Sequence, residues 1–168
     1  METIYFEETQ HFQWGFVLIP ALIAIIFGAF FLIQVIFKIQ VGNKPIPSWA
    51  HFLLFLLVGA FAFFMGLQKL QLKITSKAIY FSLGAFAPLR SINPDEIASI
   101  HLRKYNGTEE FGGWGTKSND KEDCITASGD EGIEIRFKDS TQKNILIGTQ
   151  KPTQVNAILS KYFSGPGK

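Results

Sequence analysis

Two long uncharged runs constrain the fold of this chain more than any other feature of its sequence. Gly15–Phe37 is 23 residues without a charge, and Ala50–Leu67 is 18 residues in which His51 is the only ionisable side chain. As a helix, the first run is about 34 Å long at ~1.5 Å per residue, enough for a hydrocarbon core of roughly 30 Å. Two buried helices of a soluble protein are the alternative, but too little chain remains to cover both runs. We therefore expect a transmembrane hairpin over residues 15–67, with helices at 15–37 and 50–67.

Small residues recur along both runs at a spacing typical of helix–helix contacts. Alanines and glycines lie three and four residues apart, so they form a narrow stripe on one face of each helix. Such stripes let two backbones approach closely in lipid. We expect the helices to pack through Ala21, Ala24, Gly28, Gly59, Ala62 and Gly66.

Gln34 is the one strongly polar side chain inside the first run. Polar groups inside a membrane are costly and often functional. The amide has three uses that fit its position: a hydrogen bond to the second helix, a hydrogen bond to another protomer, or contact with the membrane interface near the helix end. The sequence leaves these alternatives open.

The segments beside the two runs indicate how the hairpin is placed. Residues 1–14 carry several aromatic side chains, which favour the headgroup layer, so we expect a short interfacial lead there. Three lysines follow the second run and two lie in the link, which favours both termini and the β domain in the cytoplasm. The expected location is the inner (cytoplasmic) membrane, as a multi-pass protein with the lipid bilayer as a partner. The lysines are Lys69, Lys73 and Lys77 after the run, and Lys38 and Lys44 in the link.

The hydrophobic period changes after the second run. Residues 70–75 alternate between apolar and polar side chains, which is the pattern of a half-buried strand. Similar short runs follow, separated by turn-forming residues, and give about seven strands. Pro152 then opens an amphipathic helix. We expect residues 68–163 to form a split β-barrel closed by this helix, followed by a flexible tail over residues 164–168.

Four segments of this region carry a resemblance to a known family: Ile74–Ile79, Pro88–Ile100, Gly112–Gly115 and Ile145–Pro152. With the order of elements, they resemble the pleckstrin-homology-like (PH-like) domains of small bacterial membrane proteins, which often follow two spans. The resemblance implies a PH-like fold and a binding or scaffolding role. The chain lacks the dense Lys/Arg cluster of phosphoinositide-binding members, so the resemblance does not extend to inositol-phosphate recognition.

The most unusual local motif is Gly112-Gly113-Trp114-Gly115. It is not a phosphate-binding loop, because the Lys-Ser/Thr pair at the required spacing and the following helix are both missing. Two interpretations remain open. Trp114 either packs over the edge of the β domain or into headgroups, or it contacts a partner or ligand. This motif and the three lysines after the second run are the candidate contact residues.

No catalytic or metal-binding pattern is present in the sequence. The three histidines lie in different segments, Cys124 is the only cysteine, and no H-E-x-x-H or nucleophile-elbow motif occurs. From residue 68 onward, fourteen basic residues face eleven acidic ones, an excess too small to indicate nucleic-acid binding. We therefore expect no enzyme activity, no cofactor and no metal.

The expected function is to present a PH-like binding or scaffolding domain at the membrane surface, with a protein partner or as a homo-oligomer. The alternative is a small accessory subunit of a transport or envelope-stress membrane complex, in which the transmembrane helices carry the function. Gln34 discriminates between the two, because the alternative requires a mutation in a span to be worse than one in the β domain.

Overall fold

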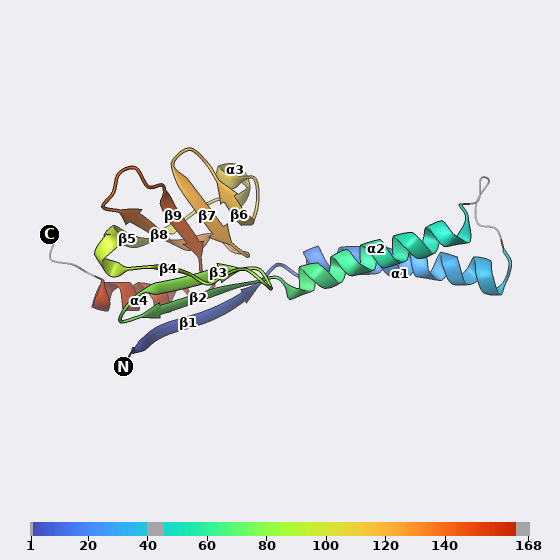
Figure 1. Ribbon diagram of the computed structural model, residues 1–168, viewed down its shortest axis with the longest axis horizontal. Coiled ribbons are helices and arrows are strands. Elements are labelled where there is room, and N and C mark those ends of the chain that lie inside the picture. The colour runs from blue at the N-terminus through green and yellow to red at the C-terminus, as the bar shows by residue number, and fades with distance from the viewer. Residues whose placement is uncertain (1, 40–45, 164–168) are drawn as a thin grey trace. The chain divides into compact units, whose positions relative to one another are not determined.

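The chain forms two compact units in the computed structural model, which describes residues 2–39 and 46–163 (Figure 1). One unit is continuous and contains Phe12–Leu67. The other combines the residues before it with those from Gln68 onward, and we call it the β unit. The expected link residue Lys44 and the expected tail over residues 164–168 lie outside the described residues.

The continuous unit is a helical hairpin of α1 (Gly15–Ile36) and α2 (Ser48–Leu67). The helices are antiparallel, since glycines late in α2 face residues early in α1. Only Ala24 in α1, and His51 and Ala62 in α2, are buried. Both helices are long and apolar enough to cross a membrane. The sequence therefore predicts both helices to within two residues at each end.

The first sheet of the β unit has the order β1-β2-β3-β4, and every neighbouring pair is antiparallel. Its first strand differs from our expectation, because the residues expected to form an interfacial lead instead form a strand paired with β2 from Ile4↔Thr75 to His11↔Lys69. The β domain thus begins before the hairpin. The strands are β1 (Ile4–His11), β2 (Lys69–Thr75), β3 (Ile79–Leu83) and β4 (Arg90–Ile92).

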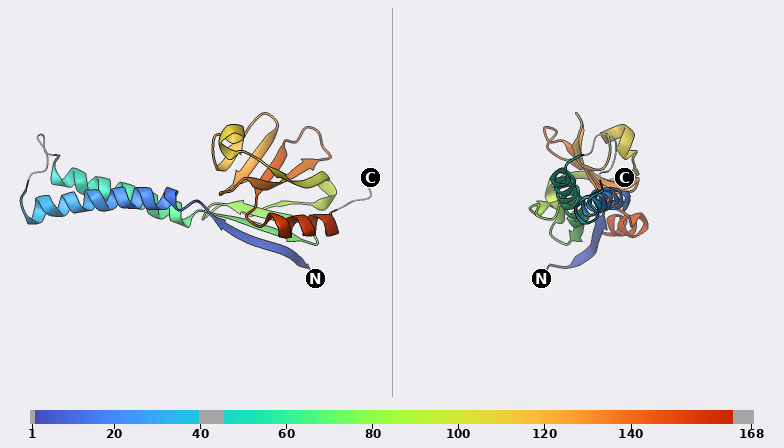
Figure 2. Two further views of the ribbon diagram at one scale, coloured as in Figure 1. Left: turned by 180° about the vertical axis from the view of Figure 1, so that it is seen from behind. Right: turned by 90° about the vertical axis from the view of Figure 1, so that its right-hand side faces the viewer.

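The second sheet has the order β5-β8-β9-β7-β6, in which β7 and β9 are parallel and the other pairs antiparallel. The single-turn η1 (Pro94–Glu96) leads from the first sheet into the second. The final helix, α4 (Pro152–Tyr162), contacts β1 and β5 (Figure 2). The remaining elements are β5 (Ile97–Lys104), α3 (Gly107–Phe111), β6 (Gly115–Ser118), β7 (Glu122–Thr126), β8 (Glu131–Phe137) and β9 (Asn144–Gly148).

The described residues form nine strands in two sheets, where the sequence predicts a split barrel of about seven strands, and these sheets do not close into a barrel. The two extra strands are β1 and β6. Residues 106–121, which the sequence predicts to be a polar, glycine-rich interval between two strands, contain both α3 and β6. The apolar core comes from both sheets and from α4, and its fully buried side chains include Leu72, Ile74, Phe81, Ile133, Ile147 and Val155.

Two buried polar side chains on β1 join the first sheet to the end of the second. The carboxylate of Glu8 accepts hydrogen bonds from the Thr149 hydroxyl at 2.7 Å and from the Gln150 backbone N–H at 2.9 Å. The side-chain amide of Gln10 donates to the carbonyl of Gly148 at 2.7 Å. All these contacts lie just before α4, so β1 holds the connection between β9 and the final helix.

We predict that Glu8→Gln destabilises the β unit by roughly 1–3 kcal/mol, because a charged acceptor of two hydrogen bonds is replaced in a buried site. Glu7→Gln is the matched control, since Glu7 is exposed and lies opposite Lys73. Its effect is expected within about 0.5 kcal/mol of zero. Denaturant unfolding of the full chain in detergent, followed by circular dichroism, measures both. Equal effects would contradict this role for Glu8.

Candidate functional site

The Gly112–Gly115 motif ends a short helix and begins a strand. Asn106 caps α3 by accepting hydrogen bonds from the backbone N–H groups of Thr108 and Glu109. At the other end, Gly112 adopts a left-handed conformation with φ of +71°. Gly113 (φ +123°) and Gly115 (φ +115°) also have backbone conformations that L side chains rarely adopt. The glycines are thus needed for the turn.

Trp114 packs against the β unit. Its indole N–H donates to the carbonyl of Gly129 at 3.1 Å, and its ring lies against Gly107, where an added Cβ would be 3.4 Å from the indole nitrogen. The side chain is half-buried. These contacts are those of a tryptophan that fixes a loop onto the sheet.

A charged cluster lies next to this motif, on the face of the second sheet that α3 partly covers. Arg103 on β5 forms ion pairs with Glu110 of α3 at 3.0 Å, with Glu122 of β7, and with Glu134 of β8 at 2.8 Å. Arg136 also pairs with Glu134, at 2.6 Å. Arg103 therefore joins two strands and a helix, and all three of its guanidinium nitrogens already face a carboxylate.

Burial and charge act in opposite directions on the two carboxylates of the sheet. At Glu122, burial is the largest influence, and the nearby charge of Glu134 adds to it, so the pKa of this carboxyl is raised above its ordinary value. At Glu134, burial also opposes ionisation, but the hydrogen bond and charge of Arg136 more than offset it, so the pKa is lowered. The same arginine thus holds two carboxylates of different basicity.

This arrangement is suited to structural support more than to chemistry. Because each guanidinium nitrogen of Arg103 lies within ion-pair distance of a carboxylate, the charge of this arginine is already balanced, and the cluster offers no ready site for a further anion. Within residues 2–39 and 46–163, no group of His, Cys, Asp and Glu side chains could hold a metal ion. Cys124 is fully buried nearby, and burial raises the pKa of its thiol to about 11. A thiol with so high a pKa is a poor nucleophile at neutral pH.

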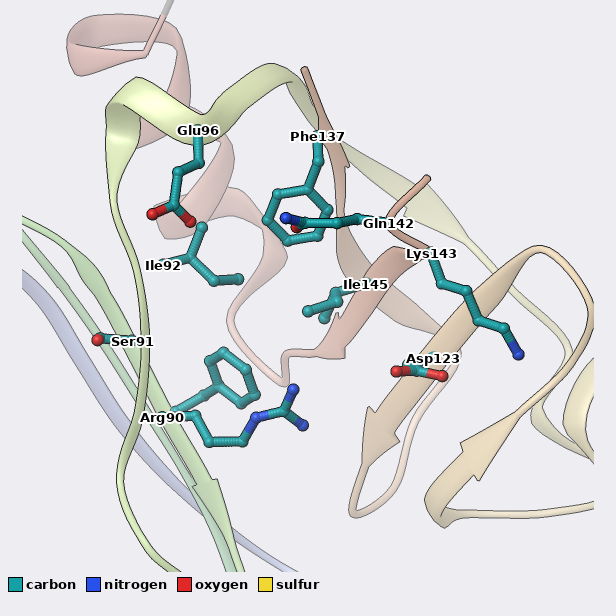
Figure 3. A pocket seen from close by; sticks show the side chains of 10 residues that line it. Arg90, Ser91, Ile92, Glu96, Asp123, Phe137, Gln142, Lys143 and Ile145 are labelled. Carbon is teal, nitrogen blue, oxygen red and sulfur yellow. The ribbon is translucent and has the colours of Figure 1, made fainter. Parts of the chain in front are cut away.

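A cleft of about 340 Å³ lies between the two sheets (Figure 3). Phe81 and Ile92 line it from the first sheet, and Ile145 lines it from the second. The Arg90 guanidinium points into the cleft and lies 5.2 Å from the centre of the Phe81 ring. Lys143 also lines the cleft, but its ammonium donates to the Ser118 hydroxyl and the Asn119 carbonyl. No sequence pattern indicates this cleft, because its residues come from distant segments.

The three lysines expected beside the membrane do not form one cluster. Lys69 begins β2, two residues after the end of α2, and lies opposite His11. Lys77 lies in the turn after β2, about 20 Å further along at ~3.3 Å per residue. Lys73 lies between them, opposite Glu7. Only Lys69 is close to a helix end along the chain, because β2 separates it from Lys77.

The structure brings the small residues of the hairpin together. An added Cβ at Gly59 would be 3.9 Å from the Cβ of Ala24, and Gly66 faces Val17 at the same distance. Gly28 faces the ring of Phe55, which an added Cβ would approach to 3.1 Å. Ala21 and Ala62 lie in the same region, where both line one groove on the hairpin.

Gln34 forms its hydrogen bonds inside the hairpin. Its amide nitrogen donates to the Ile46 carbonyl at 3.2 Å, and its oxygen accepts from the Ser48 hydroxyl at 3.0 Å. Of the three uses that its position in the sequence allows, the structure thus contains the contact with the second helix. This contact joins the end of α1 to the start of α2.

Comparison of the chain with protein-family models, with curated proteins and with solved structures finds no match. The functional argument therefore rests on the residues and contacts described above.

We predict that Trp114→Phe lowers the stability of the β unit by roughly 0.5–1.5 kcal/mol, because it removes one hydrogen bond and keeps most of the ring contact. Trp114→Ala should cost more, since it also removes the contact with Gly107. Thermal and denaturant unfolding of the full chain in detergent measure both. If Trp114→Ala leaves stability unchanged and a co-purifying protein is lost, Trp114 is a partner contact instead.

We predict that Glu134→Gln destabilises the fold more than Glu122→Gln at pH 7, although both residues pair with Arg103. The lowered pKa of Glu134 means that its contribution is present above its unfolded pKa and is lost as the pH falls through the folded value. The raised pKa of Glu122 has the opposite sign, because stability is lost as the pH rises from the unfolded to the folded value. Urea titrations of both variants at pH 7 and pH 4 test the order, and a reversed order at pH 7 would contradict these shifts.

Proposed function

We propose that this protein is a non-enzymatic integral membrane protein whose hairpin anchors the β unit at a membrane surface as a binding or scaffolding module. The observation that carries this proposal is the surface of the hairpin. Its helices have 22 and 20 residues, and most of their large apolar side chains are exposed. An exposed apolar surface of this size is unfavourable in water and favourable in lipid. The lipid bilayer is therefore the first partner.

Two exposed tryptophans support a spanning hairpin. Trp14 precedes α1 directly, and Trp49 is the second residue of α2. Because the helices are antiparallel, the two indoles lie at opposite ends of the hairpin, about 30 Å apart at ~1.5 Å per residue. Tryptophan is enriched at both interfaces of a membrane. This spacing matches the two faces of one bilayer.

The proposal keeps the PH-like assignment for the β unit. Two facing sheets and a C-terminal helix support it. The parallel pairing of β7 with β9 and the strand supplied before the hairpin are departures from the expected order. We therefore carry over the role of a scaffold and no particular ligand.

The alternative function, a transport or envelope-stress subunit acting through its helices, depends on Gln34. That side chain is hydrogen-bonded within the hairpin, which favours a structural role. A protein partner or a second copy remains compatible with the scaffolding proposal, and the β unit carries the function in either case.

We predict that the protein stays with the membrane fraction after carbonate extraction and that both termini face the cytoplasm. The native Cys124 is buried, so single cysteines introduced at exposed positions report orientation. In intact bacterial cells, an impermeant maleimide should label Lys38→Cys in the link and leave Lys138→Cys in the β unit unlabelled until the cells are permeabilised. Release by carbonate would contradict membrane insertion, and the reverse labelling would invert the orientation.

A further inference from the structure

The loop between β3 and β4 exposes apolar side chains that are not buried in the core of the β unit. Phe86-Ala87-Pro88-Leu89 are all exposed, with Phe86 at 86% and Leu89 at 62%. Among the described residues of the β unit, Ile4 and Tyr162 are the other exposed large hydrophobic side chains. The ring of Tyr162 stacks on Tyr5 at 3.9 Å. Unpartnered apolar surface in this unit is therefore concentrated in one loop.

The backbone of this loop is held in place. Gly84, with φ of +128°, donates its backbone N–H to the carbonyl of Lys69 at 3.0 Å. The Ser82 hydroxyl donates to the Ala87 carbonyl at 3.2 Å. An added Cβ at Gly84 would lie 3.3 Å from the Cβ of Ala87, so the turn is compact. Phe86 is thus displayed on a fixed turn.

The loop lies at the end of the first sheet to which the hairpin is connected. Its bond to Lys69 places it at the end of the sheet where β2 begins and β1 ends. Lys69 follows the last residue of α2 by two positions, and a chain step spans at most ~3.8 Å, so the attachment of the hairpin is within about 8 Å of Lys69. The loop therefore occupies the end of the β unit from which the hairpin leaves.

We propose that residues 84–89 are a membrane-contact loop, in which Phe86 and Leu89 enter the interfacial layer of the bilayer that the hairpin spans. The inference rests on the proposed membrane insertion. Basic side chains flank the loop, with Arg90 after it and Lys69 hydrogen-bonded beside it through the backbone, and both suit the phosphates of anionic headgroups. Because only one residue connects α2 to β2, a membrane spanned by the hairpin lies close to this loop, so we assign the contact to a lipid surface.

Fluorescent labelling tests the proposal on the full chain. The Phe86→Cys variant is labelled with an environment-sensitive nitrobenzoxadiazole dye. It is then reconstituted into proteoliposomes of phosphatidylcholine and phosphatidylglycerol at a high lipid-to-protein ratio. Ile4→Cys is the matched control, because Ile4 is also exposed, at 51%, but lies opposite Thr75 at the far end of the same sheet. Leu57→Cys, at an exposed position of α2, reports insertion of the hairpin. The unmodified chain shows whether the buried Cys124 takes up label.

Nitroxide-labelled lipids then report the depth of each label, with the nitroxide at a shallow position for residues 86 and 4 and deep in the acyl chains for residue 57, which lies at the middle of α2. We expect at least twofold quenching and a blue-shifted emission at positions 86 and 57, and no quenching at position 4. Quenching at 57 without quenching at 86 overturns the membrane-contact loop and leaves the proposed function intact. A blue shift at 86 without quenching has the same consequence, since it indicates a protein contact. Absence of quenching at 57 overturns membrane insertion itself. Melting curves of the labelled variants verify that each is folded.

Discussion

The pairing of β1 with β2 is the constraint on which the rest of the structure depends. These strands are neighbours in the first sheet, yet the whole hairpin separates them in sequence. Because His11 lies opposite Lys69, the inserted segment must leave and return at one end of the sheet. Two antiparallel helices of similar length satisfy this condition, since the start of α1 and the end of α2 then lie side by side. The connections are short, with three residues before α1 and one after α2, so both chain crossings occur at that end of the sheet.

The same strand also determines how the two sheets hold together. They do not close into a barrel, so they rely on the apolar core and on contacts between chain segments of different sheets. Glu8 and Gln10 on β1 supply such contacts at the start of α4. A carboxylate in a buried site is stable only with partners, and here a hydroxyl and a backbone N–H provide them. The polarity of β1 is therefore required by its place beside α4.

This polarity explains why the sequence predicts the helices and most strands but not β1. The length and apolar composition of the two hydrophobic runs predict the helices, and the alternation in residues 70–75 predicts β2. In β1, the inward-facing positions include a glutamate and a glutamine, so its pattern resembles that of an amphipathic segment at a membrane surface. Its partners lie some sixty residues away, and no local pattern indicates them.

In the candidate site too, some features have a local sequence signal and others have none. The sequence does contain a usable signal for α3, namely Asn106 as a cap, acidic residues in the first turn and Gly112 at the end, although the prediction for residues 106–121 is a polar interval without a helix. The ion pairs of Arg103 and the cleft at Arg90 have no comparable signal, because each brings together residues from different strands. The parallel pairing of β7 and β9 likewise depends on the whole chain.

Two arginines of the β unit differ in how far their side chains are already paired. Arg103 faces three carboxylates, so binding a further anion there would require breaking an existing ion pair. The side chain of Arg90 forms no hydrogen bond or ion pair with the described residues, and its guanidinium lines the cleft over the ring of Phe81. Its five donors are therefore available to a carboxylate or phosphate. Since Arg90 directly follows the exposed loop, the proposed membrane contact of that loop would bring its guanidinium to an anionic headgroup.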